Sequence, residues 1–263
     1  MTRTHNRQEQ AIEDAAGRIL AAQHAIALTG AGLSAESGIP TYRGPDGEWT
    51  KFGEPTIDGW ELFCENPAEW WKLASEGVEN PTAFTRALEV AEPNPGHLAM
   101  AKLEEMHQLA HVITQNIDDL HRRAGSAAVT EIHGNRNLVR CMNCGQREPL
   151  AQVRLERLPP LCLDCGGTLK IDVVMFGEPI PQDALYSCYR VTSQTDLFLV
   201  IGTSAVVSPA ADFPVLAKQR GASLIEVNPH ETALSDLADV VIRAPAGEAL
   251  PEIVARLQAA ARA

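Results

Sequence analysis

The fold is decided by the stretch Ala25-Ile-Ala-Leu-Thr-Gly-Ala-Gly-Leu-Ser34. Its first five residues read as a short buried strand, and the glycines after them mark a tight strand-to-helix turn. Backbone N–H groups at such a turn, together with a helix N-terminus, can cradle a pyrophosphate. An ordinary strand-to-helix connection explains a lone G-x-G about equally well. The standard dinucleotide fingerprint is also incomplete, because the third glycine is missing and Glu48, the nearest suitably spaced acid, lies in a loop.

Outward from this stretch, helical and strand patterns alternate along the chain. We expect strands at 25–29, 111–114, 129–132, 172–174, 196–201, 223–227 and 240–242. We expect helices at 8–23, from Trp70, after Pro81, and at 95–108, 119–124, 182–192, 210–220 and 247–261. This alternation predicts an α/β fold with a doubly wound parallel sheet, Rossmann-like in architecture. The Gly-, Pro- and charge-rich segment 40–60 is too long for an ordinary connector and indicates a binding loop.

Four cysteines interrupt the alternation as two C-x-x-C pairs: Cys141 with Cys144, and Cys162 with Cys165. This spacing is typical of a four-thiolate zinc ribbon, and glycines after each pair permit the tight knuckles. Four sulfurs would fill a tetrahedral shell and leave no position for substrate, so the predicted zinc is structural. Two disulfides or a redox pair are the alternatives, and they lack a secretory context or neighbouring cations. The sequence therefore predicts a small zinc-ribbon lobe inserted into the α/β fold.

Composition narrows the class of protein. A hydrophobic content of 45% in 263 residues supports a substantial core. No apolar run is long enough to span a membrane, and the first ten residues lack the apolar region of a signal peptide. With Cys64 and Cys188 isolated and expected to be reduced, we predict a cytoplasmic protein. A net charge of −12, from 22 basic and 34 acidic residues, argues against direct nucleic-acid binding and suits lysine-bearing polypeptides better.

Polar or glycine residues follow four of the expected strands: Gly30, Gln115, Gly202 and Asn228. The carboxyl ends of strands in an open α/β sheet line the ligand crevice, so we expect these residues to meet there. The amide of Asn228 is a candidate partner for ribose hydroxyls. An Asn-Pro turn at 228–229 is the alternative interpretation of that residue. The convergence of four strand ends is a stronger signal than any one of them.

Several segments, in this order and spacing, resemble the signature segments of sirtuins. They are Gly30-Ala-Gly-Leu-Ser-Ala-Glu-Ser-Gly-Ile-Pro-Thr-Tyr-Arg43, Thr114-Gln-Asn-Ile-Asp118, Glu131-Ile-His-Gly134, Val174-Met-Phe-Gly-Glu178, Gly202-Thr-Ser204 and Val227-Asn228. With the cysteine pairs in their usual place, the resemblance covers about residues 19 to 257. It implies NAD-dependent removal of acyl groups from lysine side chains, with nicotinamide and O-acyl-ADP-ribose as products and one structural zinc.

The resemblance assigns catalytic roles to His133, Asn116 and Asp118. His133 matches the family's general base, and an ordinary histidine pKa of about 6.5 suits that task. A lone histidine at a strand end would otherwise be read as a surface residue. Asn116 and Asp118 match the nicotinamide pocket. Without the resemblance, Asp118 would be read as an N-cap for the helix expected from Asp119, and the two roles are compatible.

Further residues match the family's contacts to NAD. Arg43 and Ser34 match positions near the phosphates and the nicotinamide ribose, and Tyr42 stands where many relatives carry Phe. The full predicted set is Gly30, Ala31, Ser34, Glu36, Pro40, Tyr42, Arg43, Trp49, Gln115, Asn116, Ile117, Asp118, Gly202, Thr203, Ser204, Asn228 and Ala246.

Substrate contacts are implied on two edges of a cleft. Relatives bind the acyl-lysine segment as an added strand, a form of β-augmentation. One edge is expected at Val174, Phe176, Gly177 and Glu178, and the other at 206–209, including Val207. Without the resemblance, 173–176 would be read simply as a buried strand.

The acyl group is expected to be uncharged, with acetyl first. The segment 30–37 resembles the subgroup that removes succinyl and malonyl groups, whose members grip the acyl carboxylate with a Tyr and an Arg three residues apart. Counted from Asn66-Pro67, the matching positions here are Ala74 and Gly77, which cannot bind a carboxylate.

The predicted domains are an NAD-binding Rossmann-like part at 7–134 and 172–262, and a small lobe. The small lobe comprises the zinc ribbon at 135–171, with 40–95 as its cofactor loop and helical part. Two other functions are the alternatives: mono-ADP-ribosyl transfer from the same NAD site, and a zinc-ribbon nucleic-acid or scaffold protein. The acidic balance disfavours the second of these.

Overall fold

Six parallel strands form the main sheet in the computed structural model, which describes residues 2–43, 47–53, 58–79 and 81–262. The strand order is β3-β2-β1-β7-β8-β9, the order of a doubly wound dinucleotide-binding sheet. The strands are β1 (Ala25–Thr29), β2 (His111–Thr114), β3 (Val129–Glu131), β7 (Leu197–Ile201), β8 (Ser223–Val227) and β9 (Val240–Ile242). The predicted fold class is therefore confirmed.

Helices cover both faces of this sheet. On one face lie α1 (Thr2–Ala21), α7 (Pro95–Glu105) and α11 (Ala246–Ala260), and on the other lie α9 (Gln182–Gln194) and α10 (Asp212–Gln219). Alternate residues of β1 serve the two layers: Ala25 and Ala27 pack with the first, Ile26 and Leu28 with the second. Because both faces are buried, the central strands are continuous apolar runs.

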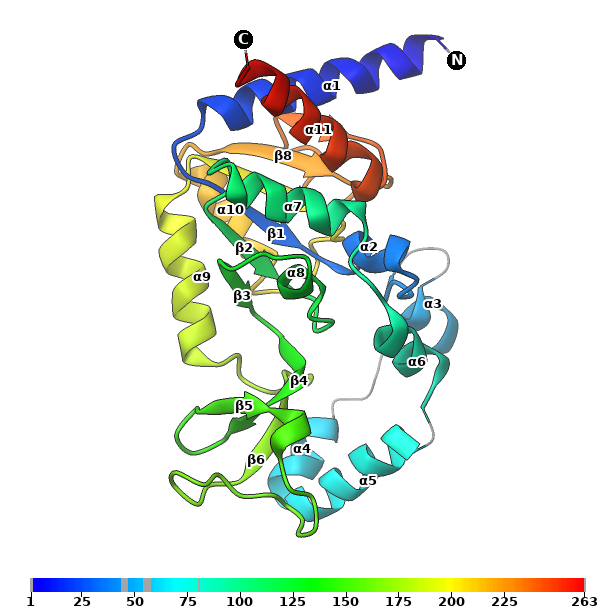
Figure 1. Ribbon diagram of the computed structural model, residues 1–263, viewed down its shortest axis with the longest axis vertical. Helices are drawn as coiled ribbons and strands as arrows, with labels where there is room; N and C mark the ends of the chain where they lie inside the picture. Colours follow the sequence, from blue (N-terminus) through cyan, green and yellow to red (C-terminus); the bar gives the residue numbers. More distant parts are fainter. Residues whose placement is uncertain (1, 44–46, 54–57, 80, 263) are drawn as a thin grey trace.

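A smaller lobe projects from the main part of the molecule (Figure 1). It contains a three-stranded antiparallel sheet of order β5-β4-β6, with β4 (Gly134–Cys141), β5 (Arg147–Pro149) and β6 (Leu169–Val173). Helices α4 (Asp58–Glu65) and α5 (Pro67–Glu79) complete it. Trp71 of α5 is buried against Val139, Cys141 and Leu169, and its indole N–H donates to the carbonyl oxygen of Leu169 at 2.8 Å. This contact fastens α5 to the small sheet.

Short elements surround the junction of the two parts. They are α2 (Ala31–Ser34), α3 (Glu48–Phe52), α6 (Ala83–Val90), α8 (Leu120–Arg123) and the 3₁₀ turn Ala35–Ser37. A second 3₁₀ turn, Leu150–Gln152, lies in the small lobe, where Leu150 packs against the cluster of Trp71 and Cys141. Of the segment 40–60, expected as a binding loop, α3 and the start of α4 are helical, whereas 44–46 and 54–57 lie outside the described residues. Within the residues that the structure describes, no helix combines the length and apolar character that a membrane crossing requires.

One expected strand is placed wrongly. We predicted that 172–174 resumes the main alternation, but these residues belong to the end of β6 and the turn after it, and β6 pairs antiparallel with β4 in the small sheet. The physical reason is charge: Lys170 and Asp172 of β6 are buried, buried charges need ionic partners, and theirs are Glu178, Arg140 and Arg147 beside the small sheet. Beyond this strand, the division of the chain into two domains stays a prediction.

Candidate active site

A cavity of about 1200 Å³ opens at the carboxyl ends of the main-sheet strands. Gly30, Gln115, Gly202 and Asn228 all line it, as the sequence predicted. Each of them donates its backbone N–H to the last residue of the neighbouring strand, at 3.0–3.1 Å. Pockets for drug-sized ligands measure about 300–1,000 Å³, so this volume suits a dinucleotide with a second substrate beside it.

The two glycines of the first turn are required by close packing. Gly32 donates its N–H to the carbonyl oxygen of Gly202 at 2.7 Å. A Cβ on Gly32 would lie 2.7 Å from that oxygen, and a Cβ on Gly30 would lie 2.7 Å from the Cβ of Thr203. Any side chain at either position would therefore push the loop after β1 away from the loop after β7. The two glycines of the G-x-G motif are thus needed because the backbones of the two loops lie in close contact at the cavity wall.

A buried polar cluster lies behind this wall. The Asn116 amide donates to the Gly30 carbonyl oxygen at 3.1 Å and to Ser34 Oγ at 3.0 Å. Ser34 in turn donates to an Asp118 carboxylate oxygen at 2.6 Å. The other oxygen of Asp118 accepts the N–H of Leu120, the first residue of α8, at 3.0 Å. The N-cap of α8 is Asp119 and not Asp118, because the helix begins one residue later than expected. Burial raises the pKa of Asp118, and the hydrogen bonds from Ser34 and Leu120 oppose that rise.

Two buried histidines extend the cluster, and sequence reasoning missed both. His97 Nε2 lies 3.4 Å from Ser34 Oγ, and His121 Nε2 lies 2.9 Å from Thr29 Oγ1. Burial lowers the pKa of His97 to about 4 and that of His121 to about 3. Both imidazoles are therefore neutral at neutral pH, and they add no charge beneath the cavity.

His133 stands where the chain leaves β3 and enters β4. Its Nδ1 lies 3.2 Å from the Gln115 carbonyl oxygen, which can only accept, so Nδ1 carries the proton and Nε2 keeps its lone pair. Its own carbonyl oxygen accepts the Val174 N–H at 2.9 Å. Burial lowers the pKa of His133, which is partly offset by the hydrogen bond to Gln115. A neutral, oriented imidazole with a free lone pair is the form that a general base requires.

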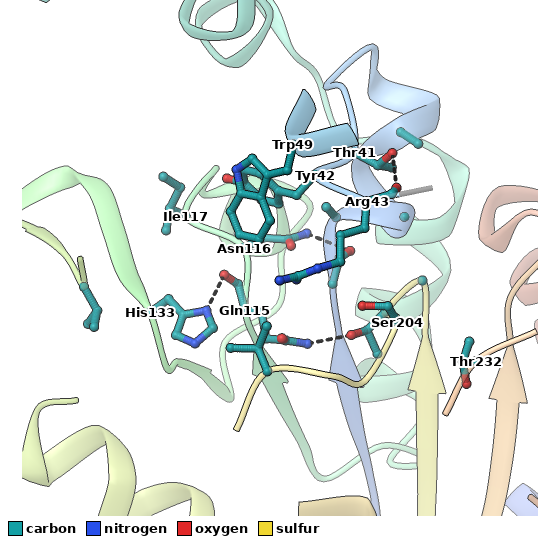
Figure 2. Close-up of a pocket in the computed structure, with 18 of the residues that line it drawn as sticks. Thr41, Tyr42, Arg43, Trp49, Gln115, Asn116, Ile117, His133, Ser204 and Thr232 are labelled. Atoms are coloured by element: carbon teal, nitrogen blue, oxygen red, sulfur yellow. Dashed lines mark hydrogen bonds between the residues drawn. The ribbon is translucent and has the colours of Figure 1, made fainter. Parts of the chain in front are cut away.

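Aromatic side chains form a group at the cavity. The Tyr42 and Trp49 rings are 4.8 Å apart, and the Trp49 and Phe176 rings are 5.5 Å apart, both measured between centroids. The Arg43 guanidinium carbon lies 4.5 Å from the centre of the Trp49 ring. Figure 2 shows His133 and Thr232 on opposite sides of the pocket, with Arg43 and Gln115 between them. Burial raises the pKa of Tyr42 to about 12, so its hydroxyl stays protonated.

The side chain of Asn228 forms hydrogen bonds with nearby backbone groups. Its amide donates to the Thr203 carbonyl oxygen at 3.1 Å, and its carbonyl oxygen accepts the His230 N–H at 3.0 Å. The turn interpretation of this residue is therefore confirmed, and the residue also lines the cavity. Gln115 makes a similar link between loops, because its side-chain amide donates to Thr203 Oγ1 at 2.9 Å.

Comparison with known proteins gives the family. The sequence model of the Sir2 family matches residues 30–209. An NAD-dependent protein deacylase of Thermococcus kodakarensis is 45% identical over 251 residues, which are 92% of this chain and 95% of the relative. NAD-dependent protein deacylase 2 of Pyrobaculum aerophilum is 44% identical over 239 residues, 90% and 92% of the two chains. The chain belongs to the Sir2 family.

Solved Sir2 structures agree with the fold. A Sir2 homologue–NAD complex is 40% identical, covers 94% of both chains and has a TM-score of 0.78. A structure described as Sir2–p53 peptide–NAD+ is 35% identical, covers 93% of this chain and 98% of that chain, and has a TM-score of 0.75. The sirtuin resemblance noted in the sequence is thereby confirmed.

Most residues that the Sir2 resemblance assigned to NAD or substrate line the cavity. The lining includes Gly30, Ala31, Glu36, Tyr42, Arg43, Trp49, Gln115, Asn116, Ile117, His133, Val174, Phe176, Gly177, Glu178, Gly202, Thr203, Ser204, Val207 and Asn228. Ser34 and Asp118 lie one layer deeper, bonded as described above. Pro40 and Ala246 adjoin the lining residues Thr41 and Pro245 in sequence. The roles of all these residues stay predictions.

Other residues join the Sir2 cavity without having been predicted. They include Ile180, Leu185, His230, Glu231, Thr232 and Pro245. Ile180 follows the predicted Val174–Glu178 edge in the chain, and 230–232 follow the Asn-Pro turn. Extending each predicted motif by a few residues would have found these positions.

The four cysteines of the small lobe form a metal site. All four sulfurs lie within 4.8 Å of one another, with 3.5 Å between those of Cys141 and Cys165 and 3.9 Å between those of Cys144 and Cys162. Zinc–sulfur bonds of about 2.3 Å place tetrahedral sulfurs about 3.8 Å apart, so the cluster fits one structural zinc. None of the four is in a disulfide. The Gly167 N–H donates to Cys165 Sγ at 3.4 Å, a hydrogen bond that favours a thiolate.

The zinc assignment predicts that Cys141→Ser lowers the bound zinc well below one ion per chain. Because a structural zinc contributes its binding free energy to folding, the melting temperature should fall by at least about 5 °C, about 2 kcal/mol for a chain of this size. Metal analysis and thermal melts check this. Cys64→Ser, which changes an exposed cysteine outside the cluster, should keep both values. Fully reduced, folded wild-type protein without zinc would contradict the assignment.

The environment of His133 predicts its titration. Burial disfavours the charged imidazolium form of His133 and lowers its pKa. In the folded chain the imidazolium should therefore lose its proton with a midpoint below pH 6.5. An NMR titration measures the midpoint, with the His133 signal assigned by its absence in His133→Asn. A midpoint at or above 6.5 would show that the imidazole is not in the buried, neutral environment described.

Proposed function

We propose that this chain is an NAD-dependent protein-lysine deacylase that acts first on acetyl-lysine, with nicotinamide and O-acyl-ADP-ribose as products. One observation carries the proposal. The carbonyl oxygen of Gln115 orients the His133 imidazole, and the next residue, Asn116, belongs to the buried Ser34–Asp118 cluster. The base and the predicted nicotinamide pocket are thus held by hydrogen bonds to adjacent residues of one loop, which keeps them close together.

The chain's own groups would divide the work as follows. NAD, when bound, supplies the ADP-ribosyl acceptor for the acyl group and releases nicotinamide. Asn116 and Asp118 would hold the carboxamide of nicotinamide, because an amide and a carboxylate match its donors and acceptors. His133 Nε2 would take a proton from a ribose hydroxyl. Trp49 and Tyr42 would shield the reacting atoms from water, which otherwise competes for the acyl group.

The peptide substrate would lie between two edges. The Val174–Glu178 edge follows directly on β6, and its Phe176 ring is 39% exposed beside the cavity. Val207 and the two residues after it also line the cavity and would form the second edge. An extended segment between such edges gains main-chain hydrogen bonds and has little sequence preference, so many lysine-bearing proteins could serve as substrates. The solved Sir2–p53 peptide–NAD+ relative supports the binding of a peptide substrate together with NAD.

The cavity favours an uncharged acyl group. Of the described residues that line it, Arg43 is the one Lys or Arg, and its guanidinium lies over Trp49. Ala74 is not among the described residues that line the cavity. Around the Val174–Glu178 edge the lining also includes Ile117, Ile180 and Leu185, which offer no partner to a carboxylate.

The proposal also covers the cellular compartment of the protein and its binding partners. We place the protein in the cytoplasm, where its six free cysteines would stay reduced and the four of the cluster would be able to hold zinc. Direct nucleic-acid binding is not part of the proposal, because 34 acidic residues outnumber 22 basic ones.

The proposal predicts that His133→Ala lowers deacetylation kcat by at least about 100-fold, the usual contribution of a general base. NAD binding and the melting temperature should stay near wild type. The assay follows loss of acetyl from a peptide by mass spectrometry, with His107→Ala, an exposed histidine outside the cavity, as the matched control. Near-normal deacetylation by folded His133→Ala would remove the assigned role. Retained transfer of ADP-ribose to protein would favour the alternative activity.

Acetyl-lysine should also be processed at least about 100-fold faster than succinyl-lysine, compared by kcat/KM on otherwise identical peptides. A succinyl carboxylate in this apolar channel would be partly desolvated and unpaired. About 2.7 kcal/mol of lost transition-state binding gives the hundredfold factor. Equal rates on the two peptides would show that a cation reaches the acyl group and that the predicted acyl pocket is wrong.

A further inference from the structure

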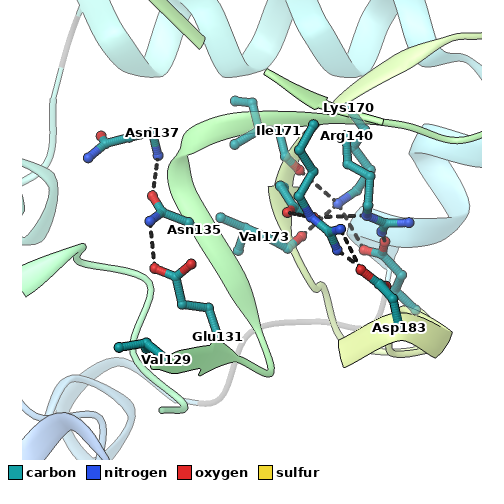
Figure 3. A network of polar contacts seen from close by, with 12 residues as sticks. Val129, Glu131, Asn135, Asn137, Arg140, Lys170, Ile171, Val173 and Asp183 are labelled. Atoms are coloured by element: carbon teal, nitrogen blue, oxygen red, sulfur yellow. Dashed lines mark hydrogen bonds and ion pairs between the residues drawn. The ribbon is translucent and has the colours of Figure 1, made fainter. Parts of the chain in front are cut away.

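Buried charges of the small sheet pair with Glu178 of the predicted substrate edge. Figure 3 shows Arg140 and Lys170 side by side in this network, with Asp183 near them. The side chains of Lys170 and Glu178 are each only 1% exposed, and that of Asp172 is 2% exposed. A buried charge persists only when it is paired and hydrogen-bonded. The arrangement of these partners therefore constrains the backbone that carries them.

Lys170 has every donor of its ammonium group in use. Its Nζ lies 2.9 Å from Glu178 Oε2, 2.6 Å from the Val173 carbonyl oxygen and 3.1 Å from that of Ile171. An ammonium group has three N–H donors, and these three acceptors match them. The Trp70 ring centre lies 5.8 Å from the same nitrogen. Because two of the acceptors are backbone atoms of β6, Lys170 can hold Glu178 in only one position.

Glu178 uses its carboxylate to close a tight turn. Its backbone N–H donates to the Met175 carbonyl oxygen at 3.0 Å, and its Oε2 accepts the Met175 N–H at 3.0 Å. Gly177, at the third position, has a φ of +81°, as a type II turn demands. Oε1 accepts from Arg140 Nη2 at 2.7 Å. The turn is thus closed through both the backbone and a side chain, and Phe176 is carried at its second position.

The network of ion pairs continues into the rest of the small sheet through Arg140 and Arg147. Arg140 Nε lies 2.8 Å from Asp172 Oδ1, and Arg147 Nε lies 2.6 Å from Asp172 Oδ2. Arg147 also pairs with Asp183 of α9 at 2.6 Å. The turn is therefore anchored to β4, β5 and β6 and through them to α9. None of Lys170, Arg140 and Asp172 lines the cavity, so they can affect a substrate only through the lining residues that they hold, Val173 and Glu178.

We propose that Lys170 is a positioning residue for the acyl-peptide substrate: acting through Glu178, it holds the Met175–Glu178 turn in the shape that presents Phe176 to the cavity. This inference rests on the proposed function. A buried ion pair is weak evidence for stability, since apolar side chains of similar size can replace it at little cost. Its effect is therefore expected on the shape of the peptide edge more than on folding.

The test compares Lys170→Met and Glu178→Gln with wild type. Both should raise the KM for an acetyl-lysine peptide at least tenfold, while the KM for NAD stays within twofold and one zinc per chain is kept. The peptide Kd, from fluorescence anisotropy of a labelled acetyl-lysine peptide, should rise in parallel. Lys218→Met is the matched control, because it removes a surface ion pair with Asp239 in the main domain. It should change neither KM.

Two outcomes would overturn the inference. One is an unchanged peptide KM and Kd in folded Lys170→Met. The other is a joint rise of both KM values with loss of zinc, which would indicate a general structural role. Should Lys170→Met not fold, Glu178→Gln decides by the same criteria, since it removes the charge and keeps the side chain's shape. Wild-type protein that releases no nicotinamide would contradict the proposed function instead, and the peptide Kd values would still decide this inference.

Discussion

The parallel pairing of β1 with β2 on one side and with β7 on the other determines where the loops that line the cavity begin. Parallel strands end at the same edge, so segments separated by more than eighty residues arrive side by side. The first residue after each strand continues the hydrogen bonding of the sheet, which fixes the start of every loop. Gly30 and Gly202 then approach so closely that neither loop can move without the other. The cavity is rigid on this side because its wall is an extension of the sheet.

The opposite wall has a different origin. It belongs to the small lobe, where a cysteine cluster, Trp71 and a set of buried ion pairs replace a large core. The two parts are joined through His133, whose imidazole contacts the Gln115 loop of the main sheet and whose carbonyl oxygen pairs with Val174 of the peptide edge. The proposed base therefore sits at the point where cofactor side and substrate side meet.

Local sequence signals predicted much of this arrangement. The C-x-x-C pairs and the glycine turn depend on neighbours a few residues away, and both appear as expected. The apolar runs gave the main-sheet strands because burial on both faces removes polar residues from them. Long-range partners were not predictable in the same way. His97 contacts Ser34, 63 positions away in the sequence, and Lys170 reaches Glu178 only because the chain turns back after β6. No sequence spacing predicts either contact. The misplaced strand at 172–174 has the same cause, because the buried charges of β6 find their partners only in the folded lobe.

The most direct test of the account is a product analysis of the wild-type chain with NAD and an acetyl-lysine peptide. Mass spectrometry should find one nicotinamide and one O-acetyl-ADP-ribose for each acetyl group lost from the peptide. A peptide that keeps its acetyl group, with ADP-ribose attached to protein or released free, would contradict the central claim.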